Sequence, residues 1–322
     1  MQVRDSDAQF RAHEAAGAYV NVNGERIFYR TEGDRGDGSP IVMLHGVPTS
    51  SYLYRKLISL SVGHHFVLAP DFPGLGLSAK PPDRDYSWSA LAQFVADFVT
   101  ALKLKPVHLV LHDIGGPIGL EFAIRRPDQV ASITLLNAPT QVSAFKKPFI
   151  MQLMATGGLN GLAFAMMQPR LMLSTWQSLG VTGNYSVSLT DMQVYRRMLT
   201  HNNGQQTFFK IMQSFGTTAE KERFLDEGLR RLGKPALVLW GKNDPAIPLV
   251  HCDWFTQRTP GAQVHLLDAK HFLMEDHAEE MAGLMTPFWD QVDGVQAESK
   301  IARDRLGERP EMKGWHKQSS EL

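Results

Sequence analysis

The sequence has only one cysteine, Cys252, among its 322 residues. A single cysteine cannot form an intramolecular disulfide or a cysteine-based zinc site, which points to a reducing compartment or to a fold that does not depend on redox conditions. The chain also lacks an excess of charge of either sign, because 33 Lys and Arg residues balance 33 Asp and Glu residues. Without a net positive field, we predict neither nucleic-acid binding nor attraction to an anionic membrane surface.

Two further absences concern secretion and membranes. The N-terminal sequence MQVRDSDAQFRAHEAAG carries charges where a signal peptide needs an apolar stretch, so we expect a cytoplasmic protein. The segment 148–169 has no charged residue and is long enough for a membrane span, but Gln152, Gly157 and Asn160 interrupt it. We therefore predict no membrane span; an apolar lid over a pocket is favoured over a partner-binding surface.

What the chain does contain is an alternation of apolar, β-branched runs with amphipathic stretches, in a composition of 43% hydrophobic and 20% charged residues. This alternation is typical of a parallel sheet covered by helices on both faces. Asn23-Gly24 predicts a hairpin between strands at 19–23 and 26–30. Further strands are predicted at 41–44, 66–69, 107–111, 133–136, 237–239 and 264–267, and helices at 50–60, 87–102, 116–125 and 278–292.

The alternation is interrupted between 138 and 224, where no convincing strand is found and a helical insertion is predicted. The prediction is therefore a core in two parts, 1–137 and 225–292, with the insertion at 138–224 between them. Residues 293–322 are polar and predict a frayed tail; the alternative is a helix that docks through Ile301, Leu306 and Trp315.

The clearest chemical signal is the run VHLVLHDIGGPIGL, which passes from an apolar strand through Asp113 into an amphipathic helix. Gly115 and Gly116 permit a sharp strand-to-helix turn that exposes the side chain at its apex. A carboxylate at that helix N-terminus gains from the dipole, stays ionised at neutral pH and can attack without a base. The alternative is an aspartate that only caps the helix.

Four more motifs follow strands in chain order. HGVPTSSYLYR begins at His45, PDFPGLGLS at Pro70, WGKNDP at Trp240 and KHFL at Lys270. Together with Asp113, this set resembles the α/β-hydrolase superfamily over residues 18–292, and within it the aspartate-nucleophile branch of epoxide hydrolases and haloalkane dehalogenases. The resemblance implies an α/β fold with a mostly parallel eight-stranded sheet, helices on both faces, and a helical cap inserted after strand six.

The resemblance also implies a catalytic triad of Asp113, Asp244 and His271, in the chain order nucleophile, acid, histidine. Asp113 would attack a saturated carbon to form an alkyl ester, and His271 would take a proton from the water that hydrolyses the ester. Asp244 would orient His271 and stabilise its charged form. Asn137 stands where some dehalogenases carry the acid, and its neutral side chain favours Asp244 for that role.

Backbone N–H groups of Val47 and Ile114 are the implied oxyanion-hole donors, and His45 and His112 are expected to support the site without taking part in the chemistry. Dehalogenases that this protein resembles usually bind the leaving halide with an Asn and a Trp at the positions of Val47 and Ile114. Neither of these side chains can donate a hydrogen bond, which counts against dehalogenation, although Trp176 could supply one donor.

An epoxide leaves as an alkoxide that needs a proton or a strong hydrogen bond, and epoxide hydrolases of this fold take it from cap tyrosines. Tyr185 and Tyr195 lie in the insertion and are the predicted donors, with His201 as a weaker candidate. For each tyrosine the alternative is a packed or surface side chain. Epoxide hydrolysis is therefore the favoured activity, haloalkane dehalogenation is the first alternative, and another hydrolysis on the same triad follows.

The substrate is expected to be a small apolar molecule, which reacts with water. The predicted pocket is lined by Trp176, Phe145, Phe149 and Phe272. No cofactor and no metal are predicted: Gly74 and Gly76 lack the spacing of a dinucleotide loop, and the Met-rich run suits adaptable packing. A homodimer is a possible assembly. A non-catalytic ligand-binding protein on the same fold is the alternative from another functional class.

Overall fold

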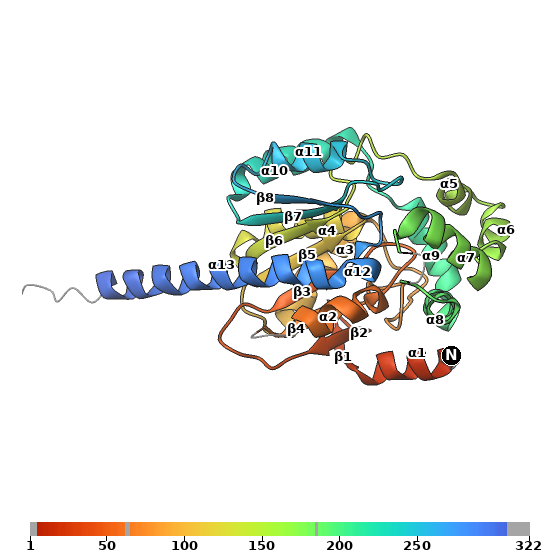
Figure 1. The fold of residues 1–322 in the computed structure, drawn as a ribbon, viewed down its shortest axis with the longest axis horizontal. Helices are drawn as coiled ribbons and strands as arrows, with labels where there is room; N and C mark the ends of the chain where they lie inside the picture. The colour runs from red at the N-terminus through yellow and green to blue at the C-terminus, as the bar shows by residue number, and fades with distance from the viewer. Residues whose placement is uncertain (1–4, 62–64, 184–185, 308–322) are drawn as a thin grey trace, which may run out of the picture.

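The computed structural model describes residues 5–61, 65–183 and 186–307, with side chains as far as 294. Its centre is an eight-stranded sheet in the order β1-β2-β4-β3-β5-β6-β7-β8 (Figure 1). The strands are β1 (Gly17–Val22), β2 (Glu25–Glu32), β3 (Ile41–Leu44), β4 (Val67–Pro70), β5 (Val107–His112), β6 (Val130–Leu136), β7 (Ala236–Gly241) and β8 (Gln263–Leu267). All eight predicted strands are therefore confirmed.

The directions of the strands decide where the strand-end motifs meet. β1 and β2 form the predicted antiparallel hairpin, with Val22 opposite Glu25, and β2 is also antiparallel to β4. The pairs β3–β4, β3–β5, β5–β6, β6–β7 and β7–β8 are all parallel. The carboxyl ends of β3 to β8 consequently share one edge of the sheet, where ligands bind in open α/β sheets.

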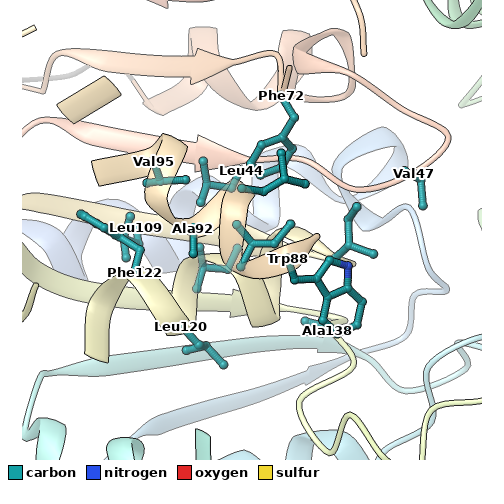
Figure 2. Packing of buried hydrophobic residues seen from close by; sticks show 14 of the residues in the cluster. Leu44, Val47, Phe72, Trp88, Ala92, Val95, Leu109, Leu120, Phe122 and Ala138 are labelled. Atoms are coloured by element: carbon teal, nitrogen blue, oxygen red, sulfur yellow. The ribbon is translucent and has the colours of Figure 1, made fainter. Parts of the chain in front are cut away.

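Each face of the sheet carries its own apolar core. In β3, Val42 and Leu44 belong to one buried cluster, whereas Ile41 and Met43 belong to the other, because successive side chains of a strand point to opposite faces. Figure 2 shows part of the first cluster, including Leu44. Both faces of a parallel sheet must be covered, which explains why β3, β4, β5, β6 and β7 are buried along their whole length.

Different helices cover the two faces of the sheet. The first cluster includes side chains from α3 (Trp88–Ala101), α4 (Gly115–Arg125), α10 (Ala219–Leu232) and α11 (Val250–Thr256). The second includes side chains from the 3-10 turn η1 (Ser51–Tyr54), α2 (Arg55–Ser61), α12 (Leu273–Asp276) and α13 (Ala278–Gly307). A further 3-10 turn, η2 (Pro127–Gln129), precedes β6. The predicted fold class is confirmed.

Between β6 and β7 the described residues form helices and no strand. Besides α10, which packs on the sheet, they are α5 (Phe149–Ala155), α6 (Asn160–Ala165), α7 (Pro169–Thr175), the π-helical turn η3 (Trp176–Gly180), α8 (Leu189–Thr200), η4 (His201–Asn203) and α9 (Gly204–Gln213). We call this set, from α5 to α9, the β6–β7 helices. Figure 1 shows them gathered at one end of the molecule, beside α12. The boundaries 138 and 224 of the cap stay a prediction.

Two helical features at the chain ends differ from the sequence-based expectation. A helix not predicted from the sequence, α1 (Ser6–Ala15), packs on α8 and buries Phe10. The predicted tail at 293–322 is wrong for its first part, because α13 continues to Gly307 (Figure 1). The segment AESKIARDRL is rich in strong helix formers, so it extends the helix despite its polarity. Trp315 lies outside the described residues.

Membrane spans were also predicted to be absent. Within the described ranges, none of the helices combines the length and the apolar character that crossing a bilayer requires.

Candidate active site

Asp113 lies at the sharp turn that the glycines of the motif predict. It follows β5 directly and adopts a left-handed backbone conformation with φ of 50°, which is costly for a residue with a side chain. A Cβ atom at Gly115 would come within 2.4 Å of the Leu44 carbonyl oxygen, and one at Gly116 within 2.3 Å of the Ala138 Cβ. Only glycine therefore allows α4 to start this close to the sheet.

The Asp113 carboxylate is buried and held by backbone donors. The Val47 N–H donates to Oδ1 at 2.9 Å, and the Ile114 N–H also donates to this carboxylate. The backbone at Gly46 comes so close to this carboxylate that only glycine fits, since a Cβ there would lie 2.2 Å from Asp113 Oδ1. Burial raises the pKa of Asp113, although the positive charge of His271 and the two N–H donors oppose the shift.

His271 lies between two carboxylates. Its Nδ1 is 2.8 Å from Asp244 Oδ2, and its Nε2 is 3.8 Å from Asp113 Oδ2. Burial disfavours the charged imidazole, but Asp244 and then Asp113 outweigh burial and raise the pKa of His271. The structure thus brings together the three residues of the predicted triad, each following a different strand.

Asp244 is fixed as an ionised hydrogen-bond acceptor. Its Oδ1 accepts the N–H groups of Ala246 at 2.7 Å and Ile247 at 3.1 Å. Burial alone would raise the pKa of Asp244, yet the charge and hydrogen bond of His271, together with these donors, lower it. An ionised Asp244 requires the proton of His271 to be on Nδ1, which leaves Nε2 facing Asp113.

Asn137 contributes more than the sequence suggested. Its Nδ2 donates to Asp244 Oδ2 at 2.8 Å and to the Gly241 carbonyl at 3.2 Å, while its Oδ1 accepts the Gly241 N–H at 2.8 Å. Asn137 therefore holds the same carboxylate oxygen that binds His271. Its position at the end of β6, beside a motif on β7, is the signal that could have indicated this contact.

His45 and His112 both lie against the site as neutral groups. The His45 ring accepts the Phe72 N–H through Nε2 at 3.1 Å, and its Nδ1 is 2.8 Å from the Gly46 carbonyl. His112 Nε2 is 3.0 Å from the His271 carbonyl oxygen, and the two imidazole rings are 4.6 Å apart. Burial lowers the pKa of both histidines, consistent with the supporting role expected for them.

An aromatic stack connects the β6–β7 helices to His271. The Trp176 ring stacks on Phe272 with centroids 3.7 Å apart, and Phe272 contacts the His271 ring at 4.7 Å. The Gly180 carbonyl also accepts the Phe272 N–H at 2.8 Å. Two of the predicted pocket residues, Trp176 and Phe272, thus lie beside the base.

Tyr195 requires a correction, because its hydroxyl is already occupied. The ring lies 4.7 Å from Trp176, but the hydroxyl donates to Glu275 Oε1 at 2.6 Å. Arg55 binds both oxygens of the same carboxylate, at 2.6 and 2.9 Å. In this arrangement Tyr195 stabilises a buried charge and offers no free O–H to a leaving group. The sequence did not indicate this hydrogen bond, because Glu275 lies 80 positions away from Tyr195.

The charge network around Glu275 was not predicted. The Glu275 side chain is fully buried and also binds Lys56 Nζ at 3.0 Å, while Arg55 reaches Asp191 of α8 at 3.0 Å. The network ties the β6–β7 helices to α2 and α12. Its signal in the sequence is the arginine that ends HGVPTSSYLYR and the acid in the segment after KHFL.

The remaining predicted residues lie elsewhere or outside the described part. Phe149 is 74% exposed, so its assignment to the pocket is wrong; α5 buries Met154 instead. Phe145 is buried against Phe215 and His251. His201 contacts Phe10 of α1, with ring centroids 5.8 Å apart. The other tyrosine, at position 185, falls outside the described residues.

Comparison with known proteins places this fold and geometry in a family. The alpha/beta hydrolase fold family matches residues 39–278, which is most of the chain. The chain therefore belongs to the α/β-hydrolase family. The matched range runs from the residues before β3 to the start of α13 and so includes strands β3 to β8.

Two relatives and one solved structure show which members of the family this chain is similar to. The chain is 32% identical over 292 residues to a haloalkane dehalogenase of Mycolicibacterium paratuberculosis, covering 86% of this chain and 91% of the relative. It is 30% identical over 308 residues to a haloalkane dehalogenase of Mycobacterium marinum, covering 87% and 97%. A solved epoxide hydrolase, CorEH, shares the fold with a TM-score of 0.71 at 21% identity, covering 86% of this chain and 99% of that one. The chain is a hydrolase of this family, in its haloalkane dehalogenase and epoxide hydrolase-like branch.

Proposed function

We propose that the protein hydrolyses a bond at a saturated carbon of a small apolar molecule through a covalent ester on Asp113. The observation that carries the proposal is the asymmetry of the Asp113 carboxylate. Oδ1 accepts the Val47 N–H at 2.9 Å, whereas Oδ2 faces Nε2 of His271 at 3.8 Å. One oxygen is thus held as the future carbonyl oxygen, and the other is directed toward the base.

In the first step Oδ2 of Asp113 attacks the carbon. A carbon–oxygen ester bond forms as the bond to the leaving group breaks, and the electron pair of the broken bond stays on the leaving group. The negative charge of Asp113 is consumed in this step. Burial that raises the Asp113 pKa makes the carboxylate less well solvated, which favours its reaction with an apolar electrophile.

In the second step a water attacks the carbonyl carbon of the ester, and Nε2 of His271 accepts its proton. The oxyanion that develops on Oδ1 is stabilised by the N–H groups of Val47 and Ile114. Asp244 stabilises the resulting imidazolium across its 2.8 Å contact. Collapse of the tetrahedral intermediate breaks the bond between the acyl carbon and the substrate oxygen, which takes the proton from His271 and leaves as an alcohol. Asp113, which now carries an oxygen from water, releases the remaining proton to solvent and is regenerated as a carboxylate.

The leaving group proposed first is an epoxide oxygen, with a vicinal diol as product. The support is the apolar character of Val47 and Ile114, which offer backbone N–H groups to Asp113 and no side-chain donors to a halide. The alkoxide needs one proton. With the Tyr195 hydroxyl bound to Glu275, Tyr185 is the residue that we propose as its donor.

A halide leaving group is the second candidate, because relatives at 30% identity or more carry the name haloalkane dehalogenase. Trp176 is the residue that we propose as a halide donor in that case, since it stacks on Phe272 next to His271. The cytoplasmic location and the homodimer remain predictions from the sequence.

The deciding experiment assays the purified protein in parallel on terminal and aryl epoxides, measuring diol, and on bromoalkanes, measuring bromide, with Asp113→Asn as the blank. Diol without bromide supports the epoxide reaction; bromide release supports dehalogenation. His271→Gln removes the base of the second step, so intact-mass analysis with the better substrate should detect the alkylated chain. Wild-type protein that forms neither product, together with a His271→Gln variant that carries no adduct, would indicate a non-catalytic ligand-binding protein.

A further inference from the structure

A second cluster of histidine and aspartate lies at the opposite edge of the sheet. His108 is the second residue of β5, the strand whose other end leads into Asp113. His65 precedes β4, and Asp293 comes from α13. One potential ligand atom from each of these three residues lies within 4.8 Å of the other two.

The distances inside this amino-edge cluster fit a small ion. His108 Nε2 is 3.2 Å from Asp293 Oδ1, and His65 Nδ1 is 3.9 Å from Asp293 Oδ2. In a tetrahedral zinc site with bonds of about 2.0–2.1 Å, neighbouring ligand atoms lie roughly 3.3 Å apart. The His65 and His108 rings are 3% and 0% exposed, so water does not compete freely for them.

The second nitrogen of each ring already has a partner. His108 Nδ1 is 2.8 Å from Ser132 Oγ, and His65 Nε2 is 3.1 Å from Asp290 Oδ1. Metal-binding histidines are oriented in this way by an outer partner on the nitrogen that does not bind the metal. By contrast, the buried Nε2 of His108, which points at Asp293, has no hydrogen-bond partner of suitable geometry.

The Asp293 carboxylate is also held in a fixed orientation. The Ser39 N–H donates to its Oδ2 at 2.9 Å, while its Oδ1 faces His108 Nε2. A carboxylate fixed beside two buried imidazoles gives the mixed nitrogen and oxygen ligand set that divalent transition metals bind.

We propose that His65 Nδ1, His108 Nε2 and the Asp293 carboxylate bind a divalent transition-metal ion, with Zn²⁺ the best match to two imidazoles and one carboxylate. The Ser39 carbonyl oxygen, 3.3 Å from His65 Nδ1, is suited to the fourth position. The ion would join α13 to the amino ends of β3, β4 and β5. This site is independent of the proposed function, because it lies at the other edge of the sheet.

The test is equilibrium dialysis of tag-free full-length protein against Zn²⁺, followed by elemental analysis. We expect one zinc per chain, removable with a chelator, and a thermal midpoint raised by roughly 3–5 °C at saturating Zn²⁺. Asp293→Asn should weaken binding by at least about 100-fold, since it removes a ligand. His277→Asn is the matched control, because His277 pairs with Asp276 at 2.8 Å outside the cluster.

Two further measurements keep the proposal testable if Asp293→Asn does not fold. Co²⁺ should give the visible absorption of a tetrahedral site in the wild type and lose it in His65→Gln. A chelator should leave the rate of substrate hydrolysis unchanged. Zinc binding and hydrolysis are therefore measured separately, and a failure of the metal site is distinguishable from a failure of the proposed function. A wild type that retains no stoichiometric zinc, or a His65→Gln variant that binds zinc as the wild type does, would overturn the metal site.

Discussion

The two ends of β5 carry the same residue types in different environments. At the carboxyl end, Asp113 accepts two backbone N–H groups and faces His271 at 3.8 Å. At the amino end, His108 faces Asp293 at 3.2 Å. The pKa of His271 is raised, whereas that of His108 is lowered, although both rings are buried. For His271 the charges of Asp244 and Asp113 outweigh the cost of burial, whereas for His108 burial outweighs the charges of Asp293 and Asp290.

The difference also concerns how each cluster is assembled. The carboxyl edge uses loops that immediately follow strands, so each residue belongs to a local motif such as WGKNDP or KHFL. The amino-edge cluster takes one residue from within a strand, one from before a strand and one from the last helix. Strand-end loops can vary without disturbing the core, which is why binding and catalytic residues concentrate there.

The strongest way to test the comparison is to remove one carboxylate at each edge. We expect Asp113→Asn to lower the rate of hydrolysis by at least about 1,000-fold, because the amide is a poor nucleophile. Asp293→Asn should leave the rate within about threefold. Steady-state rates on the preferred substrate, with circular dichroism as a check on folding, measure both. Similar losses in the two variants would mean that the edges are not functionally separate.

The buried ion pairs beside the carboxyl edge allow a second test. Glu275→Gln leaves Arg55 and Lys56 without their shared carboxylate, so the free energy of unfolding should fall by about 3 kcal/mol. Exposed Glu279→Gln is the matched control and should change it by less than about 0.5 kcal/mol. Urea denaturation measures the difference. Equal stability of the two variants would contradict a structural role for the network.

The pH dependence sharpens the contrast between the histidines. Activity requires neutral His271; because the pKa of His271 is raised, the acid limb of the pH–rate profile should lie above the ordinary histidine value of 6.5. Asp244→Asn should move the His271 titration to lower pH, because it removes the charge that contributes most to raising the pKa of His271. The rate at which the covalent ester on Asp113 is hydrolysed, measured against pH, reports this shift. An acid limb at the same pH in the variant would contradict a role of Asp244 in stabilising charged His271.

Stability should respond to the same proton with the opposite sign. A raised pKa in the folded state means that the folded protein binds the proton more tightly than the unfolded chain. The His271 contribution to stability is therefore complete below the unfolded pKa and is lost as pH rises through the higher folded pKa. His108, with its lowered pKa, should favour the folded state at higher pH instead.

The smallest effect is expected for Tyr195→Phe. The variant keeps the ring contact with Trp176 and loses the hydrogen bond to Glu275, so unfolding should become easier by about 1.5 kcal/mol. Diol formation, where present, should fall by less than about threefold. A loss of several orders of magnitude in epoxide opening, with bromide release spared, would restore the donor role first predicted for this residue.

Much of the fold and the position of the candidate nucleophile could be predicted from the sequence. Asn23-Gly24 specified a hairpin because its turn needs positive φ, and the structure has φ of 52° at Asn23 and 88° at Gly24. Gly115 and Gly116 likewise predicted the sharp turn after Asp113, since a side chain at position 115 would collide with Leu44 of β3 and one at position 116 with Ala138. These features depend on neighbouring residues, so a single stretch of sequence contains them.

Helix ends and exposed apolar residues were less predictable. Phe149 looked like a pocket residue from its type alone, yet it is 74% exposed, because the orientation of α5 depends on packing against the other β6–β7 helices. The predicted helix at 278–292 was also too short, because α13 continues to Gly307. A polar helix without an apolar stripe has no periodic signal to mark its end.

The sequence by itself determined which residues stand after the strands, and hence the family and the predicted triad. Only the tertiary structure decided that Tyr195 donates to Glu275, that Arg55 reaches a carboxylate 220 positions away, and that His65, His108 and Asp293 meet. Local motifs are set by backbone conformation and strand order. Partners of buried charges are selected among all groups that folding brings together, because an unpaired buried charge is so costly.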